Sequence, residues 1–258
     1  MLNFRNTNIL FGALAILLIG FHIFHGGISF FFYPALLFIY SWVLFYGCAY
    51  VGSNFFLPVI CSSTTGRKEI ALSFDDGPAP SYTPEILAIL REEAVKAAFF
   101  CIGNRITGNE KIFRQLHEEG HVIGNHSYSH HFWFDLFSSR KMLADLKKMD
   151  NTMSAVTGLQ PRLFRPPYGV INPNLKAAIL RGGYTPIGWS VRSLDTVIKD
   201  EQKLLKKIND AIKPGAILLF HDTSQTTLAI LPGFIREVKE RGYEIVRLDK
   251  MLNLQAYV

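Results

Sequence analysis

The sequence predicts an α/β protein, a distorted (β/α)7 TIM-like barrel preceded by N-terminal transmembrane helices. Three observations predict it. Short apolar runs alternate seven times with stretches of helical periodicity from Arg67 to the C-terminus, which is typical of parallel strands joined by crossover helices. No glycine-rich phosphate-binding turn follows the first apolar run, and this favours a barrel over an open sheet. Residues 6–66 contain no charged side chain apart from two histidines.

The uncharged N-terminal segment is apolar enough to enter a membrane. Its first run, Ile9–Phe24, has 16 residues, slightly fewer than the roughly 20 that span a bilayer core. A cleaved signal peptide would explain Arg5 and this run, but it would leave the longer second run without a membrane. We expect a membrane anchor at residues 1–65 with one or two transmembrane segments, about 9–24 and 29–55, or one span plus an interfacial segment.

The water-soluble part of the chain is expected at residues 66–258, beyond a polar linker at Ser62–Gly66. It holds 26 basic side chains (27 less Arg5) and 21 acidic ones, a balance of +5, and its length suits one domain. The basic excess would suit an anionic polymer of the cell envelope. Lysines such as Lys206 and Lys207 are, however, typical of solvated helix faces, and we expect no nucleic-acid partner.

Strands and helices are predicted from apolar runs and from apolar residues at helical spacing. The predicted strands are Glu69–Phe74, Lys96–Cys101, His121–Gly124, Arg162–Arg165, Tyr184–Trp189, Ala216–Phe220 and Tyr243–Arg247. Thr83 and Pro84 are typical of a helix start, and Gly158 of a helix stop. Core-facing helical stripes are Met142, Leu146, Met149, Met153 and Val156, then Leu204, Ile208 and Ala211, then Leu231, Phe234 and Val238.

Residues able to do chemistry follow five of the seven predicted strands. The five segments are Ser73–Gly77, His126–His130, Arg165–Gly169, Trp189–Asp195 and Leu218–Asp222. In barrels of parallel strands the carboxyl ends of all strands meet at one face, and active sites lie there. The sequence therefore predicts a catalytic centre at that face.

Two of these segments indicate a metal site. The spacing of His126 and His130 puts both imidazoles on one face of a helical turn, where they could bind one ion. Ser127 stands where the HExxH motif of zinc proteases requires glutamate, so that class is excluded. Asp75 and Asp76 are costly at the end of an apolar strand unless paired or metal-bound. One could bind the ion while the other accepts a proton from water, although Asp-Asp-Gly-Pro is equally good turn chemistry.

The remaining candidates each have a purely structural interpretation. A lone histidine such as His221 is usually a buried one with a satisfied hydrogen bond, and Arg165 could pair with a surface acid. The coincidence of all five segments at one barrel end favours the catalytic interpretation. We expect no catalytic part for His117, His121 and His131, and no disulfide framework or CxxC metal pair from Cys48, Cys61 and Cys101.

Over about residues 68–250 these segments resemble the polysaccharide deacetylase family, also called the NodB-homology domain or carbohydrate esterase family 4. Ser73–Gly77 is similar to its first motif, His126–His130 to its second, Arg165–Gly169 to its third and Leu218–Asp222 to its fifth. The resemblance implies that Asp76, His126 and His130 bind a divalent metal, zinc first, with cobalt or nickel as alternatives.

The same resemblance implies roles for the other residues. Asp75 would be the general base, oriented by Arg165, and His221 the general acid that protonates the leaving amine. Asp195 would favour protonated His221. Substrate would meet the backbone N–H of Tyr168, which stabilises the oxyanion, and the side chain of Leu219, which lines the acetyl pocket. Ser127 and Ser129 would only support the metal ligands.

The fourth motif departs from the family pattern Asp-x-x-Asp-Trp. Asp195 is retained, but Arg192 replaces the first aspartate and Thr196 the tryptophan. Loss of that indole removes one wall of the acetyl pocket. We therefore expect an altered preference for the acyl group or substrate, with the metal and proton-transfer residues unaffected.

The sequence leads us to expect a metal-dependent hydrolase that removes N-acetyl groups from N-acetylglucosamine or N-acetylmuramic acid in envelope polysaccharide, peptidoglycan above all. One alternative enzyme acts on a lipid-linked amino sugar as a deacylase or deformylase, and O-deacetylation of xylan is a third. A further alternative is a non-catalytic, membrane-bound carbohydrate-binding module. We expect an integral protein of the cell membrane with its catalytic domain outside the cytoplasm.

Overall fold

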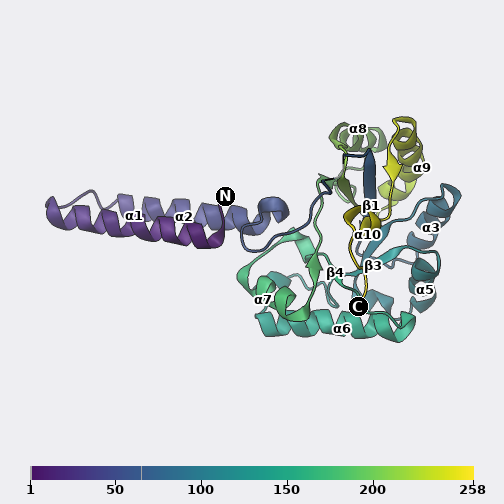
Figure 1. The fold of residues 1–258 in the computed structure, drawn as a ribbon, viewed down its shortest axis with the longest axis horizontal. Helices are drawn as coiled ribbons and strands as arrows, with labels where there is room; N and C mark the ends of the chain where they lie inside the picture. Colours follow the sequence, from purple (N-terminus) through teal and green to yellow (C-terminus); the bar gives the residue numbers. More distant parts are fainter. Residues whose placement is uncertain (1, 65) are drawn as a thin grey trace.

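The computed structural model describes residues 2–64 and 66–258, and Thr65 in the predicted linker lies outside the described residues. It consists of a helical hairpin and an α/β domain (Figure 1). The hairpin is formed by α1 (Phe4–Phe24) and α2 (Phe32–Ala49), and the α/β domain follows.

The hairpin projects from the domain, with its turn at the far end and the N-terminus next to the domain (Figure 1). Both helices are long and apolar enough to cross a membrane, and almost none of their residues is buried. The second helix ends at Ala49, short of the predicted residue 55, because the chain there turns into the domain. Phe4 N–H donates a hydrogen bond to the Phe55 carbonyl (3.0 Å), so the segment after α2 also holds the start of α1.

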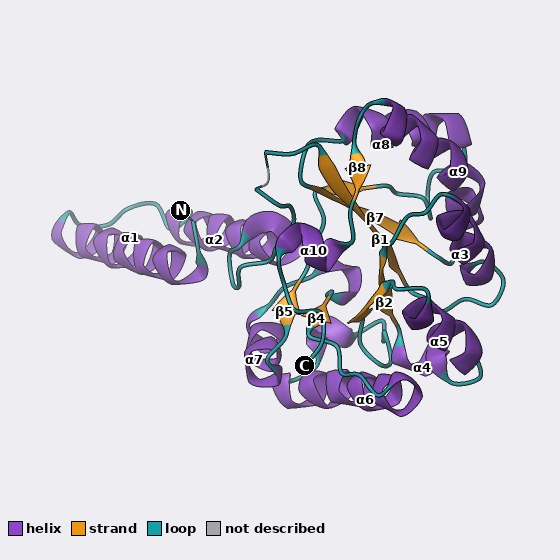
Figure 2. Ribbon diagram, turned by 45° about the vertical axis from the view of Figure 1, so that its right-hand side comes forward, coloured by secondary structure: helices purple, strands orange, loops and turns teal. Residues whose placement is uncertain are grey.

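The domain is built on one sheet of parallel strands with helices around it, an incomplete barrel (Figure 2). The strand order is β5-β4-β3-β2-β1-β7-β6, and β8 pairs with the first two residues of β1. This agrees with the predicted distorted barrel. The strands are β1 (Glu69–Asp75), β2 (Ala98–Cys101), β3 (Val122–Asn125), β4 (Leu163–Phe164), β5 (Thr185–Pro186), β6 (Val191–Arg192), β7 (Ala216–His221) and β8 (Glu244–Ile245).

The predicted fifth strand, Tyr184–Trp189, is wrong in its extent, because only β5 lies within it and the next strand, β6, begins beyond Trp189. Residues before the predicted domain pair with the chain between β5 and β6. Ile60 forms a parallel bridge with Ile187, its N–H donates to the Pro186 carbonyl (3.1 Å), and its carbonyl accepts from Gly188 (2.9 Å). The segment preceding the predicted linker is therefore part of the barrel wall.

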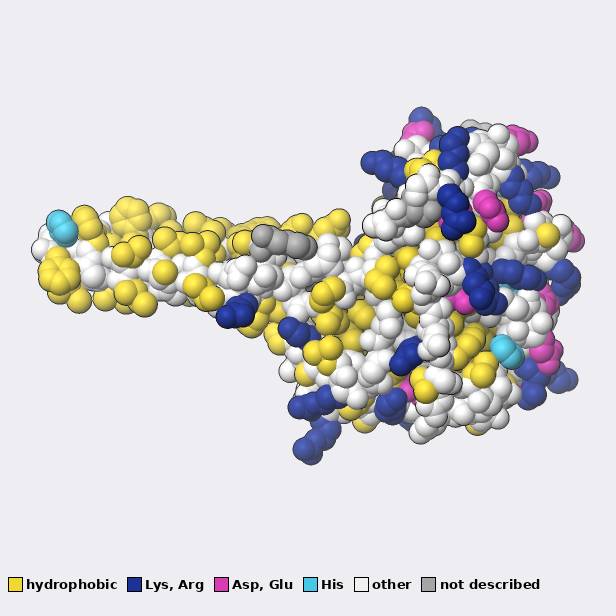
Figure 3. Space-filling model, in the orientation of Figure 1, with side chains coloured by type: hydrophobic (Ala, Val, Ile, Leu, Met, Phe, Trp, Pro, Cys, Tyr) yellow, Lys and Arg dark blue, Asp and Glu magenta, His cyan; other side chains and the backbone are white. Residues whose placement is uncertain are grey.

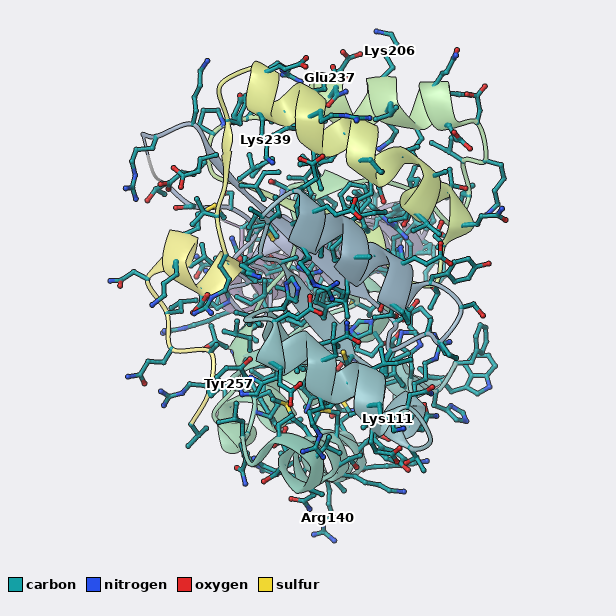
Figure 4. All side chains as sticks on the ribbon, turned by 90° about the vertical axis from the view of Figure 1, so that its right-hand side faces the viewer. Lys111, Arg140, Lys206, Glu237, Lys239 and Tyr257 are labelled. Carbon is teal, nitrogen blue, oxygen red and sulfur yellow. The ribbon has the colours of Figure 1, made fainter. Side chains whose placement is uncertain are left out.

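Helices pack around the sheet and complete the core. They are α3 (Thr83–Glu92), α4 (Gly103–Ile106), α5 (Glu110–Glu118), α6 (Ser139–Thr157), α7 (Pro173–Gly182), α8 (Glu201–Ala211), α9 (Gln225–Glu240) and α10 (Leu248–Leu252). The predicted stripe on α6 is buried from Met142 to Met153, and Gly158 ends this helix with a left-handed φ of 74°. Lys206 of α8 and Arg140 of α6 extend from opposite edges of the domain (Figure 4).

A second hydrophobic cluster joins the hairpin to the domain. Residues 51–59 contribute Val51, Phe55, Phe56, Leu57 and Val59, which are all buried and pack with apolar side chains of α6 and α7. The segment that follows α2 is thus part of the packed core of the domain.

Candidate active site and metal centre

The carboxyl ends of β1, β3, β4 and β7 bring the predicted site residues together. A cavity of about 160 Å³ lies there, and its lining includes the three candidate metal ligands with Asp75, Tyr168, Leu219 and His221. Arg165 and Asp195 lie behind this lining. Arg165 bonds Asp75, and Asp195 bonds His221. Trp189, Arg192 and Thr196 form another part of the lining, and no role was predicted for Trp189.

Asp76, His126 and His130 form a group able to hold a metal ion. Asp76 Oδ1 lies 3.6 Å from His126 Nε2 and 3.5 Å from His130 Nε2, and the three ligand atoms lie within 4.8 Å of one another. Nitrogen and oxygen ligands at about 2.0–2.1 Å from a tetrahedral ion lie roughly 3.3 Å apart. The distances from Asp76 Oδ1 to the two imidazole nitrogens are therefore close to those between the ligands of one metal ion.

The hydrogen bonding of these groups fits a metal. His126 Nδ1 lies 2.8 Å from the Arg165 carbonyl, which can only accept, so the ring carries its proton there and turns the Nε2 lone pair toward Asp76. Asp76 Oδ1 is buried and has no hydrogen-bond partner among the described residues. A buried carboxylate oxygen without a partner is costly, and a cation between it and the imidazoles would remove that cost.

The loop that carries the two histidines is not the helical turn predicted from their spacing. Ser127 and His130 both have positive φ, 66° and 43°, and the segment is irregular. Asn125 Oδ1 accepts from Ser127 N–H (2.8 Å), and Ser127 Oγ accepts from His130 N–H (3.0 Å). Side chains that bond the backbone replace the helix, and they still bring both imidazoles to one ion position.

Asp145 also fixes this loop, and sequence reasoning missed it. Its Oδ1 accepts from the N–H groups of Tyr128 (2.7 Å) and Ser129 (3.2 Å). Asn125 was missed as well; it is buried and donates to Asp150 Oδ1 (2.8 Å). Both belong to the core pattern of β3 and α6, so no local motif distinguishes them.

Asp75 is held by a fully buried arginine. Arg165 Nη1 donates to Asp75 Oδ1 (2.7 Å) and to Ser73 Oγ (2.8 Å), and Nη2 donates to the Gly188 carbonyl (2.9 Å). Its guanidinium also lies over the Phe100 ring, 4.0 Å from the centroid. Asp75 Oδ2 is then directed to the metal side, 3.8 Å from His126 Nε2.

His221 is paired with a buried aspartate on the opposite side of the cavity. Its Nδ1 lies 2.8 Å from Asp195 Oδ1, and Asp195 also accepts from the His221 N–H and from the hydroxyls of Ser193 and Thr227. Burial opposes charge on the imidazole, but the hydrogen bond and the charge of Asp195 outweigh it and raise the pKa of His221. Burial likewise opposes charge on Asp195, yet its hydrogen bonds with His221 and the hydroxyls lower its pKa.

Tyr168 and Leu219 also line the cavity. Tyr168 has a positive φ of 59°, is 46% exposed, and donates its hydroxyl to the His130 carbonyl (3.3 Å). Leu219 is buried in β7 and reaches the cavity lining. His117, His121 and His131 do not line this cavity, and buried His121 accepts a hydrogen bond from Ala97 N–H (3.1 Å).

Comparisons with known proteins agree with this arrangement. The sequence model of the family described as polysaccharide deacetylase matches residues 62–187. The peptidoglycan-N-acetylglucosamine deacetylase PgdA of Listeria monocytogenes is 34% identical over 202 residues, which are 78% of this chain and 42% of that protein. The chain therefore spans less than half the length of that relative.

Two further relatives are covered more completely. A peptidoglycan-N-acetylglucosamine deacetylase of Bacillus cereus is 33% identical over 191 residues, which are 72% of this chain and 89% of that protein. The crystal structure of the Bc1960 peptidoglycan N-acetylglucosamine deacetylase aligns with a TM-score of 0.72 at 28% identity, over 84% of this chain and 97% of that one.

Proposed function

Because the chain belongs to the polysaccharide deacetylase family, we propose that it is a metal-dependent hydrolase of N-acetylated sugars in the cell envelope. Its substrates would be N-acetylglucosamine or N-acetylmuramic acid residues, with peptidoglycan as the first candidate polymer. The observation that carries the proposal is the unpartnered, buried Asp76 Oδ1 facing two imidazoles beside a fixed aspartate and a fixed histidine.

Asp76, His126 and His130 would hold the metal, for which zinc is the first candidate and cobalt or nickel the alternatives. When bound there, the ion would polarise the amide carbonyl and acidify water. With only three protein ligands, a position would remain open for water or substrate, as in catalytic sites with two histidines and one carboxylate.

Asp75 would be the general base. Arg165 occupies its Oδ1, so Oδ2 is the oxygen available to accept the proton of the attacking water. A base held in one orientation beside the metal ligands needs no rearrangement when the proton moves, and such positioning accounts for much of general-base catalysis.

His221 would be the general acid. The amide nitrogen is a poor leaving group, and it must gain a proton as the carbon–nitrogen bond breaks to give acetate and a free amine. Asp195 fixes the imidazole through Nδ1 and favours its protonated form, so Nε2 is the atom that would deliver the proton. The backbone N–H of Tyr168 would meet the oxyanion, and Leu219 the acetyl methyl group.

The two paired charges argue against a non-catalytic binding module. A protein that only bound sugar would need neither a buried arginine on Asp75 nor a buried aspartate on His221, and buried charges are costly to keep. The helical hairpin supports a membrane anchor with both helices as spans. Two spans would put the domain on the same side of the membrane as the N-terminus. We propose that this side is outside the cytoplasm, because envelope polymers lie there.

The test is acetate release by the full-length protein in detergent, because residues 51–59 belong to the domain core. Peptidoglycan and N-acetylglucosamine oligomers are supplied with and without a chelator. We expect chelator-sensitive acetate, reduced roughly 10²–10⁴-fold in Asp75→Asn. Asp210→Asn, an exposed residue of α8, is the matched control and should be unaffected. Equal rates in Asp75→Asn and wild type would refute the proposed base.

A further inference from the structure

A second, larger cavity adjoins the candidate active site on the side of the hairpin. It has a volume of about 750 Å³ and shares two lining residues, Trp189 and Arg192, with the catalytic cavity. Its opposite wall is formed by the chain that follows α2, from Ala49 to Asn54, and by the segment 59–62. The catalytic cavity thus opens toward the end of the hairpin.

Among the described residues that line this cavity, Arg192 is the charged one. Its guanidinium is exposed, lies 6.0 Å from the centroid of the Trp189 ring, and makes no ion pair in the part of the chain that the structure describes. Lys207 lies beside it, and its ammonium group donates a hydrogen bond to the Arg192 carbonyl. The remaining lining is apolar or neutral, including Tyr50, Val59 and Ile60. Such a surface is complementary to an anion attached to an apolar group.

Exposed apolar side chains also lie beside Tyr168, which lines the catalytic cavity. In the loop after His130, Phe132 is 71% exposed, Trp133 57% and Leu136 74%. The end of α2 and this loop each bond one of two adjacent residues, Ile171 and Asn172. The Ile171 N–H donates to the Cys48 carbonyl (3.0 Å), and Asn172 Nδ2 donates to the Asp135 carbonyl (2.7 Å).

The exposed loop therefore lies where the hairpin meets the domain. On the face drawn in Figure 3, hydrophobic side chains cover the hairpin and continue onto the adjoining part of the domain, and charged ones dominate farther away. Exposed aromatic residues next to a spanning helix are typical of the membrane–water interface. With the hairpin inserted, the catalytic cavity would open close to the lipid headgroups.

We propose that the substrate is an N-acetylated sugar joined through phosphate to a membrane lipid, with Arg192 binding the phosphate and the cavity at the end of α2 receiving the lipid-proximal part. This inference rests on the proposed deacetylation and specifies its substrate. A planar guanidinium binds phosphate through two parallel hydrogen bonds. A sugar held by its phosphate at the bilayer surface would present its acetamido group to the neighbouring metal ligands without leaving the membrane.

The test uses the full-length protein in phospholipid vesicles and measures acetate release. The substrates are N-acetylglucosamine linked by diphosphate to a short polyprenol, the neutral alkyl glycoside of the same sugar, N-acetylmuramic acid as an alkyl glycoside, and peptidoglycan. We expect kcat/KM for the diphosphate substrate to exceed that for the neutral glycoside about tenfold or more. This ratio should collapse in Arg192→Gln and be largely retained in Arg192→Lys.

Arg140→Gln is the matched control, because Arg140 is an exposed arginine of α6 that lines neither cavity, and it should leave every rate unchanged. A ratio near one in the wild type, or a ratio unaltered by Arg192→Gln, would overturn the inference while leaving deacetylation standing. A preference for the muramic carboxylate or for peptidoglycan would also overturn it. No acetate from any substrate, with metal bound, would refute the proposed function as well.

Discussion

The two sides of the catalytic cavity are built differently. On the side of β1, β3 and β4, Arg165, Asp75 and His126 are buried and hold one another by hydrogen bonds of 2.7–2.8 Å. On the side that follows β5, Arg192 and Thr196 are exposed, and Trp189 is only half-buried. The first side carries the family motifs, and the second departs from them.

This difference separates the reaction from the choice of substrate. Groups that bind metal or move protons must keep one geometry, and buried, mutually bonded side chains maintain it. Groups that select a substrate contact only its outer parts, so their residues can change without loss of the chemistry. We expect substitutions on the two sides to have effects of different size and kind.

The largest expected effect is on turnover. His221→Gln removes the proposed acid while keeping a side chain of similar reach, and we expect acetate release to fall roughly 10²–10⁴-fold. Bound metal, measured by elemental analysis, should stay at the wild-type level because His221 is not among the three ligands. If turnover fell less than about threefold, the acid would have to be another group.

The next largest effect is on stability, and it compares an arginine-to-methionine substitution on each side of the cavity. Arg165→Met leaves Asp75 and Ser73 buried without their partner, so the free energy of unfolding should fall by about 3–5 kcal/mol. Arg192→Met changes an exposed side chain, and the expected change is within about 0.5 kcal/mol. Denaturant unfolding of both variants in the same detergent measures the difference. Equal losses would show that the two sides are equally constrained.

A smaller effect concerns the pH dependence of the reaction. Asp195 raises the pKa of His221, so the imidazole stays protonated, and able to act as an acid, to higher pH than an isolated histidine. In Asp195→Asn this charge is lost, and the alkaline limb of the kcat/KM profile should move to lower pH. Asp210→Asn on α8 should leave the limb in place. A shift to higher pH in Asp195→Asn would contradict the pairing.

The smallest effect is on acyl selectivity. Thr196→Trp restores the indole that the family pattern has at this position and would narrow the cavity next to Trp189. We expect the rate ratio of acetyl to propionyl substrates to rise a few-fold, on the order of 10-fold at most, because one methylene changes binding by about 1–3 kcal/mol. Thr196→Ala is the control and should not raise the ratio.

The sequence predicted which side chains come together better than it predicted the conformation of the loop that carries two of them. Asp75, Asp76, His126, His130 and His221 were found because each follows a predicted strand within a recognisable motif, and the fold brings them together. The helical turn assigned to the two histidines was wrong. Side-chain acceptors on Asn125 and Ser127 hold a loop that the four-residue spacing alone does not distinguish from a helix.

Long-range features were not predictable from local pattern. The bridge from Ile60 to Ile187 joins residues far apart in the sequence, so neither the extent of the fifth strand nor the barrel role of the segment before the linker left a local signal. Trp189 is the last residue of a predicted strand, but its place in both cavities depends on the packing of residues 51–62 against it.

The most direct test of the metal-dependent chemistry is a titration of metal into the chelator-treated full-length protein, with bound zinc and acetate release measured on the same samples. We predict that activity rises with bound metal and stops rising at one equivalent per chain. Asp75→Asn should bind the same equivalent and release almost no acetate, and Asp76→Ala should lose the equivalent. Full activity without metal, or one equivalent retained in Asp76→Ala, would contradict the account.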